Sequence, residues 1–272
     1  MTLPFFAYTI LFLFMPAGSV LVGAFQGKAG GYTFENVRQL FHHPYIDAYE
    51  TSIKVSLITA VLGGVVGLLI AYAAIREGTP RWIRSAITTF SGVAANFGGI
   101  PLAFAFVSTL GPLGIITVFF RKHGWDPTTH GFSLFTQHGV ELAYMYFQLP
   151  LMILVIAPAI DGLRNEWREA SANLGASQWQ FWRYVGVPVL MPALLGAIIL
   201  LFGNAFAAYA TAYSLTSGTV NLVPILIGAY YSGNVLDNPH LAQALAFGMF
   251  VVLALMMVIY VPLQRRAARW AK

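Results

Sequence analysis

The sequence predicts an all-α integral membrane protein with six transmembrane helices. Two features of the composition indicate this class: 58% of the 272 residues are hydrophobic and only 9% are charged, whereas an ordinary soluble domain carries about 25% charged residues. The third observation is that long apolar stretches recur along the chain, each close to the ~20 residues that a helix needs to cross a bilayer. We therefore expect one transmembrane domain over residues 1–272.

The six expected spans have central parts without Asp, Glu, Lys, Arg or His. They cover residues 3–25, 53–75, 85–109, 141–162, 189–212 and 244–264. The N-terminus lacks a basic region and a convincing cleavage site, so we expect the first span to remain in the protein rather than act as a signal peptide. Residues 113–120 are apolar but too few to cross a bilayer, and we expect an interfacial or re-entrant piece there.

Lysine and arginine are unevenly distributed over the loops, which predicts the orientation. One side holds ten basic residues: Arg76, Arg81, Arg84, Arg164, Arg168, Arg183, Arg265, Arg266, Arg269 and Lys272. The other side holds five, together with six acidic residues: Lys28, Arg38, Lys54, Arg121, Lys122, Glu35, Asp47, Glu50, Asp126, Glu141 and Asp237. Because cytoplasmic loops are enriched in basic residues, we expect the ten-residue side and both termini to be cytoplasmic.

Several kinds of chemistry find no support in the sequence. There is no cysteine, the histidines lack the spacing of a metal site, and we expect no metal. No G-x-x-x-x-G-K-[ST] motif occurs, so the chain lacks a P-loop and is not expected to hydrolyse ATP or to be an enzyme. The net charge of +5 indicates orientation rather than nucleic-acid binding. Because the spans lack the deep ionisable groups of a proton-driven carrier, transport would need energy from a partner.

Residues 163–188 form a polar segment between two spans. Charged side chains crowd its start: Arg164, Glu166, Arg168 and Glu169. Each would cost roughly 2–3.5 kcal/mol at the centre of a bilayer, so this segment must lie outside the hydrocarbon.

The same segment has the pattern of two short helices. Apolar residues recur at helical spacing over the first part: Leu163, Trp167, Ala170 and Leu174. Gly175 then ends the helix and permits a tight bend that a side chain would obstruct. Ser177 and Gln180 have the spacing of a capping box, which predicts a second helix over residues 178–185. We call residues 163–188 the elbow. Two short helices joined at a glycine form a surface to which another protein could bind.

The elbow resembles the EAA loop of ABC importer permeases. That family pattern is Glu-Ala-Ala, three residues, Gly, nine residues, Ile, any residue, Leu-Pro. The chain reads Glu169-Ala170-Ser171, three residues, Gly175, nine residues, then Val185-Gly186-Val187-Pro188. The spacing is kept throughout, and Ser171, Val185 and Val187 are conservative departures.

The resemblance implies a permease subunit of a binding-protein-dependent importer in the bacterial inner membrane, with the type I ABC importer permease fold. Its implied partners are ABC ATPase subunits, a second permease subunit (identical or distinct), an extracytoplasmic substrate-binding protein and membrane lipid. ATP and Mg²⁺ would be held by the ATPase, and this chain would bind no cofactor. The residues implied or expected to couple to the ATPase are Glu169, Ala170, Ser171, Gly175, Arg164, Arg168, Arg183 and Pro188.

Polar residues inside the spans are candidates for the translocation path. In permeases of the resembled family the fifth span lines this path, and here it carries Asn204 and Tyr209. A polar side chain in hydrocarbon needs a partner or a water-filled cavity, so these residues either line the path or bond between helices. Asn96 precedes Gly98 and Pro101 in the third span, where a kinked or opened helix is expected, and we assign it to the path as well.

The sequence leaves more than one substrate and more than one class of transporter open. The general look of the chain is similar to that of spermidine and putrescine permeases, especially in Gly203-Asn204-Ala205-Phe206-Ala207-Ala208-Tyr209 and in the outer segment to Asn238-Pro239-His240. This resemblance suggests a polyamine, while related permeases import ferric iron, thiamine, sulfate or phosphonate. The competing class is a self-sufficient secondary carrier or channel. That class would need deep ionisable groups or paired broken helices.

Overall fold

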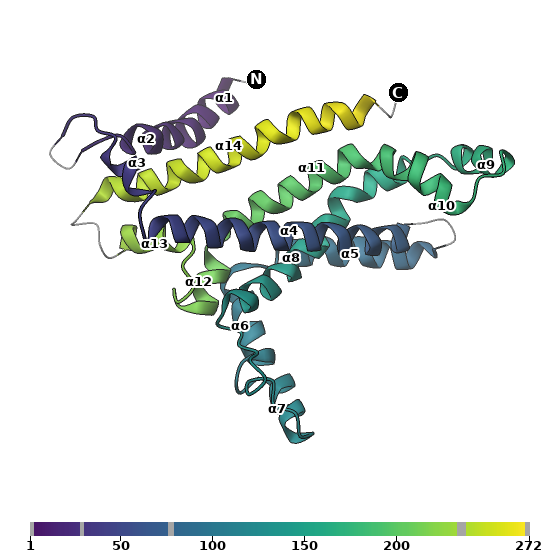
Figure 1. Ribbon diagram of the computed structural model, residues 1–272, viewed down its shortest axis with the longest axis horizontal. Coiled ribbons are helices and arrows are strands. Elements are labelled where there is room, and N and C mark those ends of the chain that lie inside the picture. Colours follow the sequence, from purple (N-terminus) through teal and green to yellow (C-terminus); the bar gives the residue numbers. More distant parts are fainter. Residues whose placement is uncertain (1–2, 28–29, 76–78, 233–237, 270–272) are drawn as a thin grey trace. The chain divides into compact units, whose positions relative to one another are not determined.

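The computed structural model describes residues 3–27, 30–75, 79–232 and 238–269 (Figure 1). These residues form helices and turns, and an isolated β-bridge joins Gln26 and Tyr32. The all-α class expected from composition is confirmed.

Four charged residues used to predict the orientation lie outside the described residues. They are Lys28, Arg76, Asp237 and Lys272. The orientation itself stays a prediction.

The chain divides into two compact units, and the division falls within two long helices, α4 and α14. The first unit comprises Met1–Ile53 and Asn221–Leu255, and the second comprises Lys54–Val220 and Met256–Lys272. The helices of the first unit are α1 (Leu3–Thr9), the π-helical η1 (Ile10–Phe14), α2 (Met15–Gly23), α3 (Glu35–Gln39), α13 (Val223–Ser232) and the first parts of α4 (Tyr45–Ile75) and α14 (Pro239–Arg269).

The first unit is joined by buried polar contacts between segments far apart in the sequence. The Asn36 side-chain amide donates to the Gln26 carbonyl oxygen at 2.7 Å, and the Asn238 amide donates to Asn36 Oδ1 at 2.9 Å. The Tyr49 hydroxyl donates to the Leu245 carbonyl oxygen at 2.6 Å. Because a buried polar group is costly unless it is bonded, these contacts fix which residues pair within this unit.

The second unit contains the remaining helices. They are α5 (Arg81–Asn96), α6 (Gly99–Leu110), α7 (Ile115–Lys122), α8 (Gln137–Asp161), α9 (Asn165–Asn173), α10 (Gln178–Phe181), the π-helical η2 (Trp182–Gly186), α11 (Val187–Phe206) and α12 (Ala210–Thr216), with the second parts of α4 and α14.

Helix α8 is the centre of the second unit. It packs against α5 and α11, while α12 packs against α6. Glycines on α4 let it approach α8 closely: a Cβ at Gly67 would lie 2.6 Å from the Cβ of Met152, and one at Gly63 would lie 2.9 Å from the Cβ of Gln148. Small residues at such contacts allow close packing of membrane helices, and Gln148 and Met152 are fully buried.

Within the described part of the chain, six helical segments are long and apolar enough to cross a membrane. They are Pro4–Gly23, Tyr45–Ile75, Gly99–Lys122, Gln137–Asp161, Gln178–Phe206 and His240–Arg266. The third differs from the expected span over residues 85–109 because it combines α6 with α7, which a turn at residues 111–114 separates. The expected third span is itself divided at Phe97 and Gly98, between α5 and α6. This interruption agrees with the opened helix that Gly98 and Pro101 indicate.

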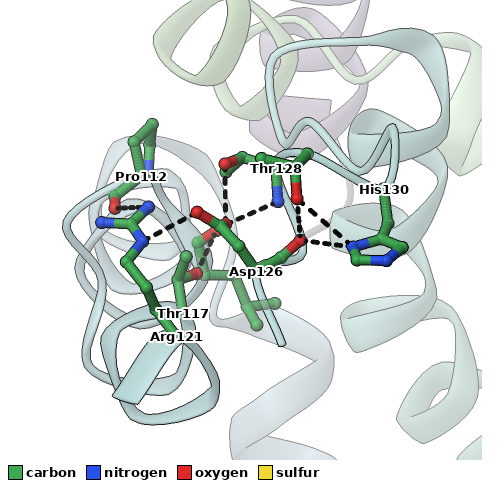
Figure 2. Close-up of polar contacts among 8 residues, drawn as sticks. Pro112, Thr117, Arg121, Asp126, Thr128 and His130 are labelled. Carbon is green, nitrogen blue, oxygen red and sulfur yellow. Dashed lines mark hydrogen bonds and ion pairs between the residues drawn. The ribbon is translucent and has the colours of Figure 1, made fainter. Parts of the chain in front are cut away.

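A polar cluster orders the chain that follows α7 (Figure 2). The Asp126 carboxylate accepts hydrogen bonds from Arg121 Nε at 2.9 Å, from the Thr128 hydroxyl at 2.7 Å and from the Thr128 N–H at 3.0 Å. The Asp126 carbonyl oxygen lies 2.8 Å from His130 Nδ1. The bonds from Thr128, and then from Arg121, lower the pKa of the Asp126 carboxyl below its ordinary value. The charged form of Asp126 is therefore the form that holds this loop.

We expect Asp126→Ala to loosen the segment from Arg121 to His130 without disturbing the spans, because its bonds are local. Hydrogen exchange of peptides covering this segment should become several times faster. Asp47→Ala, a change at another partly exposed aspartate, which pairs with His43, is the control and should leave these peptides unchanged. Equal exchange in wild type and Asp126→Ala would contradict the role given to Asp126.

Candidate functional site

The elbow begins where α8 ends, and glycine geometry forms its bend. In Figure 1, α9 and α10 lie beyond the ends of α8 and α11. At the end of α9 the Gly175 N–H donates to the Ala172 carbonyl oxygen at 2.9 Å, and the Ala176 N–H donates to the Ser171 carbonyl oxygen at 3.0 Å. This pair of bonds, with Gly175 at a φ of 79°, is a Schellman motif.

The bend needs glycine for its backbone angle and not for space. Apart from Gly175 and its two chain neighbours, no heavy atom of the described residues lies within 4 Å of the position that a Gly175 Cβ would take. The expectation that a side chain would obstruct the bend by its size is therefore wrong, and the requirement for glycine comes from the backbone angle. A left-handed φ disfavours residues with a Cβ through strain within their own backbone.

The predicted capping box at the start of the second helix is present. The Ser177 N–H donates to Gln180 Oε1 at 2.7 Å, and the Gln180 N–H donates to Ser177 Oγ at 3.3 Å. The second helix, however, does not end before Pro188, because α10 continues through η2 into α11. Pro188 lies in the first turn of α11, directly after η2, and the wider π-helical turn before it gives the proline ring room.

The elbow presents an exposed surface with both apolar and charged groups. Glu169 is exposed and has no ion-pair partner among the described residues. Apolar side chains around it are also open, with Leu174 exposed to 88% and Trp167 to 38%. Ala170 is exposed as well. The apolar face predicted for the first helix therefore exists but is largely uncovered.

The three arginines of the elbow have different surroundings. The Arg183 guanidinium lies 4.9 Å from the centre of the Trp179 ring and 5.7 Å from that of Tyr184, a cation–π arrangement on the exposed side. Arg164 and Arg168 instead line a recess behind α9. The Ser171 hydroxyl donates a hydrogen bond to the Arg168 carbonyl oxygen within the same helix, at 2.8 Å.

The second candidate site is a cavity where two helices are interrupted. The three residues assigned to the path from the sequence, Asn96, Asn204 and Tyr209, line this one cavity of about 380 Å³. It lies where α5 gives way to α6 and where α11 gives way to α12. The fifth span, expected to run to residue 212, is interrupted after Phe206, the last residue of α11.

Hydrogen bonds hold the two interruptions together. The Gly99 N–H, at the start of α6, donates to Thr211 Oγ1 on α12 at 2.7 Å. The Tyr144 hydroxyl on α8 donates to the Ala208 carbonyl oxygen at 2.6 Å. These contacts satisfy backbone groups that leave the helical pattern and would be costly to bury without a partner. Thr211 and Tyr144 were not assigned to the site from the sequence, since nothing in their spacing indicates which carbonyl or N–H they meet.

Comparison with known proteins adds a family match. Residues 115–269 match the family described as "Binding-protein-dependent transport system inner membrane component". This stretch covers the elbow and the cavity residues Asn204 and Tyr209.

Two curated proteins illustrate the similarity. The "probable sulfate transport system permease protein cysT" of Nephroselmis olivacea is 29% identical over 229 residues, which cover 81% of this chain and 74% of that protein. The "sulfate transport system permease protein CysW" of Synechocystis sp. is 26% identical over 260 residues, covering 93% of this chain and 86% of that protein. Neither name supports the expectation of a polyamine substrate.

A solved structure has a similar fold. It is a chain of a bacterial ABC transporter involved in the import of the acidic polysaccharide alginate, with a TM-score of 0.76 and 18% sequence identity. The similarity covers 98% of this chain and 94% of that one. At this identity the comparison concerns the fold alone.

Proposed function

The chain belongs to the family of binding-protein-dependent transport system inner membrane components, and from this premise we propose that it forms the path for a small oxyanion, with sulfate as the leading candidate. Its relatives are permease subunits, the non-catalytic membrane components of ABC importers.

The exposed elbow is the observation that carries the proposal for coupling. A Schellman bend and a capping box hold its shape, while the Glu169 carboxylate and the Leu174 side chain remain uncovered. An uncovered apolar and charged surface on a rigid element is typical of a docking site. We assign the docked partner as an ABC ATPase subunit, since the chain has no P-loop of its own.

The remaining coupling residues have supporting positions. Gly175 sets the bend, Pro188 lies where the elbow enters α11, and Ala170 and Ser171 complete the exposed helix. Arg183 faces outward, while Arg164 and Arg168 lie between α9 and the ends of the spans. Movement of α9 would thus reach α11 without a flexible linker. The elbow side, with both termini, is cytoplasmic in this proposal, and a substrate-binding protein and a second permease subunit complete the importer.

The cavity at the interrupted helices supports the choice of an oxyanion. Its described lining offers amide, hydroxyl and backbone groups from Asn96, Asn204, Tyr209 and Thr211 but no Asp or Glu. A polycation such as spermidine would be expected to use carboxylates, whereas an anion is bound by amides, hydroxyls and backbone N–H groups. The sulfate permeases among the relatives point the same way.

The test is to identify what co-purifies with the tagged chain and what the assembled importer takes up. Mild-detergent pull-down followed by mass spectrometry should recover a P-loop ATPase and a second permease subunit. Vesicles containing this assembly, with ATP and the binding protein, should accumulate radiolabelled sulfate and not spermidine. A stable chain without any ATPase would overturn the importer, and ATP-driven uptake of spermidine alone would overturn the cargo.

The paired interruptions are the one observation that favours a second function. Broken helices near the middle of the membrane also occur in secondary carriers. Such carriers place ionisable groups at that depth, and the described lining of this cavity holds only the phenol of Tyr209. Uptake driven by an ion gradient without ATP would establish the carrier instead.

A prediction follows from the backbone angle of the bend. Gly175→Val should weaken ATPase co-purification and transport, because a β-branched residue in the left-handed region costs roughly 1–2 kcal/mol and shifts the docked helix. Gly175→Asn is the matched control at the same position, since asparagine tolerates this region better. Wild-type transport by Gly175→Val would show that the bend does not depend on glycine.

A further inference from the structure

The recess behind α9 is a cavity of about 210 Å³ at the end of the second unit that carries the elbow. Its walls come from the ends of α4 and α8, the start of α5, the first turn of α9 and the segment where α10 meets η2. The charged side chains that line it are Arg84, Asp161, Arg164 and Arg168.

The charges in this recess are not balanced. Arg84 and Asp161 form an ion pair, so the one acid among the described lining residues already has a cation. Arg164 and Arg168 also face the recess, and neither forms an ion pair with a carboxylate among the described residues. Arg164, the N-cap residue of α9, and Arg168, in the first turn of α9, both carry a positive charge. The recess therefore has an excess positive charge that a bound anion would neutralise.

The donors in the recess suit one kind of anion. A guanidinium presents planar N–H groups that match the oxygens of phosphate or sulfate groups. The recess also lies at the start of α9, whose N-cap residue, Arg164, makes no side-chain cap hydrogen bond. The positive end of the helix dipole therefore acts in the same direction as the arginines.

Two aromatic side chains form part of the wall of the recess. The Tyr72 and Trp182 rings meet edge to face at 4.8 Å between centres, and both line the recess. The recess is partly open to solvent, and its volume of about 210 Å³ leaves room for one tetrahedral anion together with several waters. The position at the span ends is also where a phospholipid headgroup is found.

We propose that this recess is a binding site for a tetrahedral oxyanion, held by Arg164 and Arg168 at the base of the elbow. The phosphate of an anionic lipid and a free inorganic sulfate or phosphate share this chemistry. A bound anion would hold α9 against the ends of α4, α5 and α8. If the proposed function is correct, occupancy would then change how firmly the elbow transmits movement.

The test measures binding to the purified chain with whatever partners it retains, in nanodiscs of phosphatidylcholine. Sodium sulfate and sodium phosphate are titrated separately at constant ionic strength, with calorimetry and tryptophan fluorescence as readouts. A parallel series contains phosphatidylglycerol in the bilayer and reads thermal stability. Trp182→Phe should remove most of the fluorescence response while calorimetry still detects binding, because Trp182 lines the recess.

The variants locate the site. Arg168→Gln should weaken binding by about tenfold or more, since it removes a charge-assisted donor pair, and Arg168→Lys should give an intermediate loss. Arg183→Gln carries the same charge change in the same elbow but faces outward, so anion binding should be unchanged. Sulfate bound in the cavity lined by Asn204 and Tyr209 would not respond to Arg168, which separates the two sites.

Each outcome has one meaning. Saturable binding of sulfate or phosphate in phosphatidylcholine that Arg168→Gln weakens supports the site with a free anion as ligand. Stabilisation only by phosphatidylglycerol, lost in Arg168→Gln, supports it with a lipid headgroup as ligand. No response to any of these probes, or equal responses in wild type and Arg168→Gln, overturns the proposal. Since neither ATP nor transport is measured, the proposed importer function stands or fails separately.

Discussion

Glu169→Lys is expected to abolish ATP-driven transport and the co-purification of the ATPase while leaving the chain folded and inserted. The side chain is exposed and has no ion-pair partner among the described residues, so its replacement removes nothing from the fold. At an interface, truncating one partner of a buried, hydrogen-bonded charge pair costs about 2–5 kcal/mol. Reversal of the charge adds repulsion, so a loss well beyond tenfold is expected in the pull-down.

Glu166→Lys is the matched control, with the same charge reversal one turn earlier on α9. Glu166→Lys changes the net charge of the elbow by the same amount but leaves Glu169 in place. Size-exclusion profiles and thermal stability of both variants should match wild type. If Glu166→Lys lost the ATPase equally, the charge of the helix and not Glu169 would be responsible. If Glu169→Lys kept both the ATPase and transport, the proposed docking would be wrong.

Gly67→Leu is expected to produce the largest loss of stability. A Cβ at this position would lie 2.6 Å from Met152 Cβ and 3.2 Å from the Leu149 carbonyl oxygen. Side chains beyond Cβ would need α4 and α8 to separate. Overpacking of a core costs about 1–3 kcal/mol of folding free energy. Here the added side chain would also disrupt the contact between two long helices. We expect a clear drop in the thermal midpoint and in yield from the membrane.

Gly92→Leu on α5 separates packing from helix propensity. Nothing lies within 4 Å of the Cβ position of Gly92, and leucine is the better helix former by roughly 0.5–1 kcal/mol at either site. This control should be as stable as wild type in detergent. Equal stability of Gly67→Leu and wild type would show that α4 and α8 do not approach as closely as the structure has them.

The local features of the elbow were accessible from the sequence because they depend on neighbouring residues. A capping box needs Ser177 and Gln180 three residues apart, and a helix end needs a residue such as Gly175 that tolerates a positive φ. Both are present. The end of the second helix could not be predicted from the sequence. Pro188 indicates a helix boundary only when no π-helical turn precedes it, and the π-helical turn η2 forms through packing between helices.

Inferences from overall likeness were less secure than those from motifs. The elbow motif indicated the permease family, and the match over residues 115–269 agrees. The expectation of a polyamine came from the general look of the chain and is not supported by the sulfate permeases it resembles. A motif is a set of residues at fixed spacing, so it can be recognised in the sequence. Substrate choice depends on a few groups in a cavity that separate spans form together, and their spacing in the sequence carries no such pattern.

The sequence by itself determined the membrane class, the elbow and its two caps, since composition and short-range spacing carry that information. It also marked Asn96, Asn204 and Tyr209 as polar residues in apolar surroundings. Only the tertiary structure decided that these three line one cavity, that Thr211 and Tyr144 hold its interrupted backbone, and that Arg164 and Arg168 turn to a recess with Arg84. The physical reason is that such groupings depend on which helices pack together. That choice is made by close contacts such as Gly67 against Met152, which join residues 85 positions apart in the sequence.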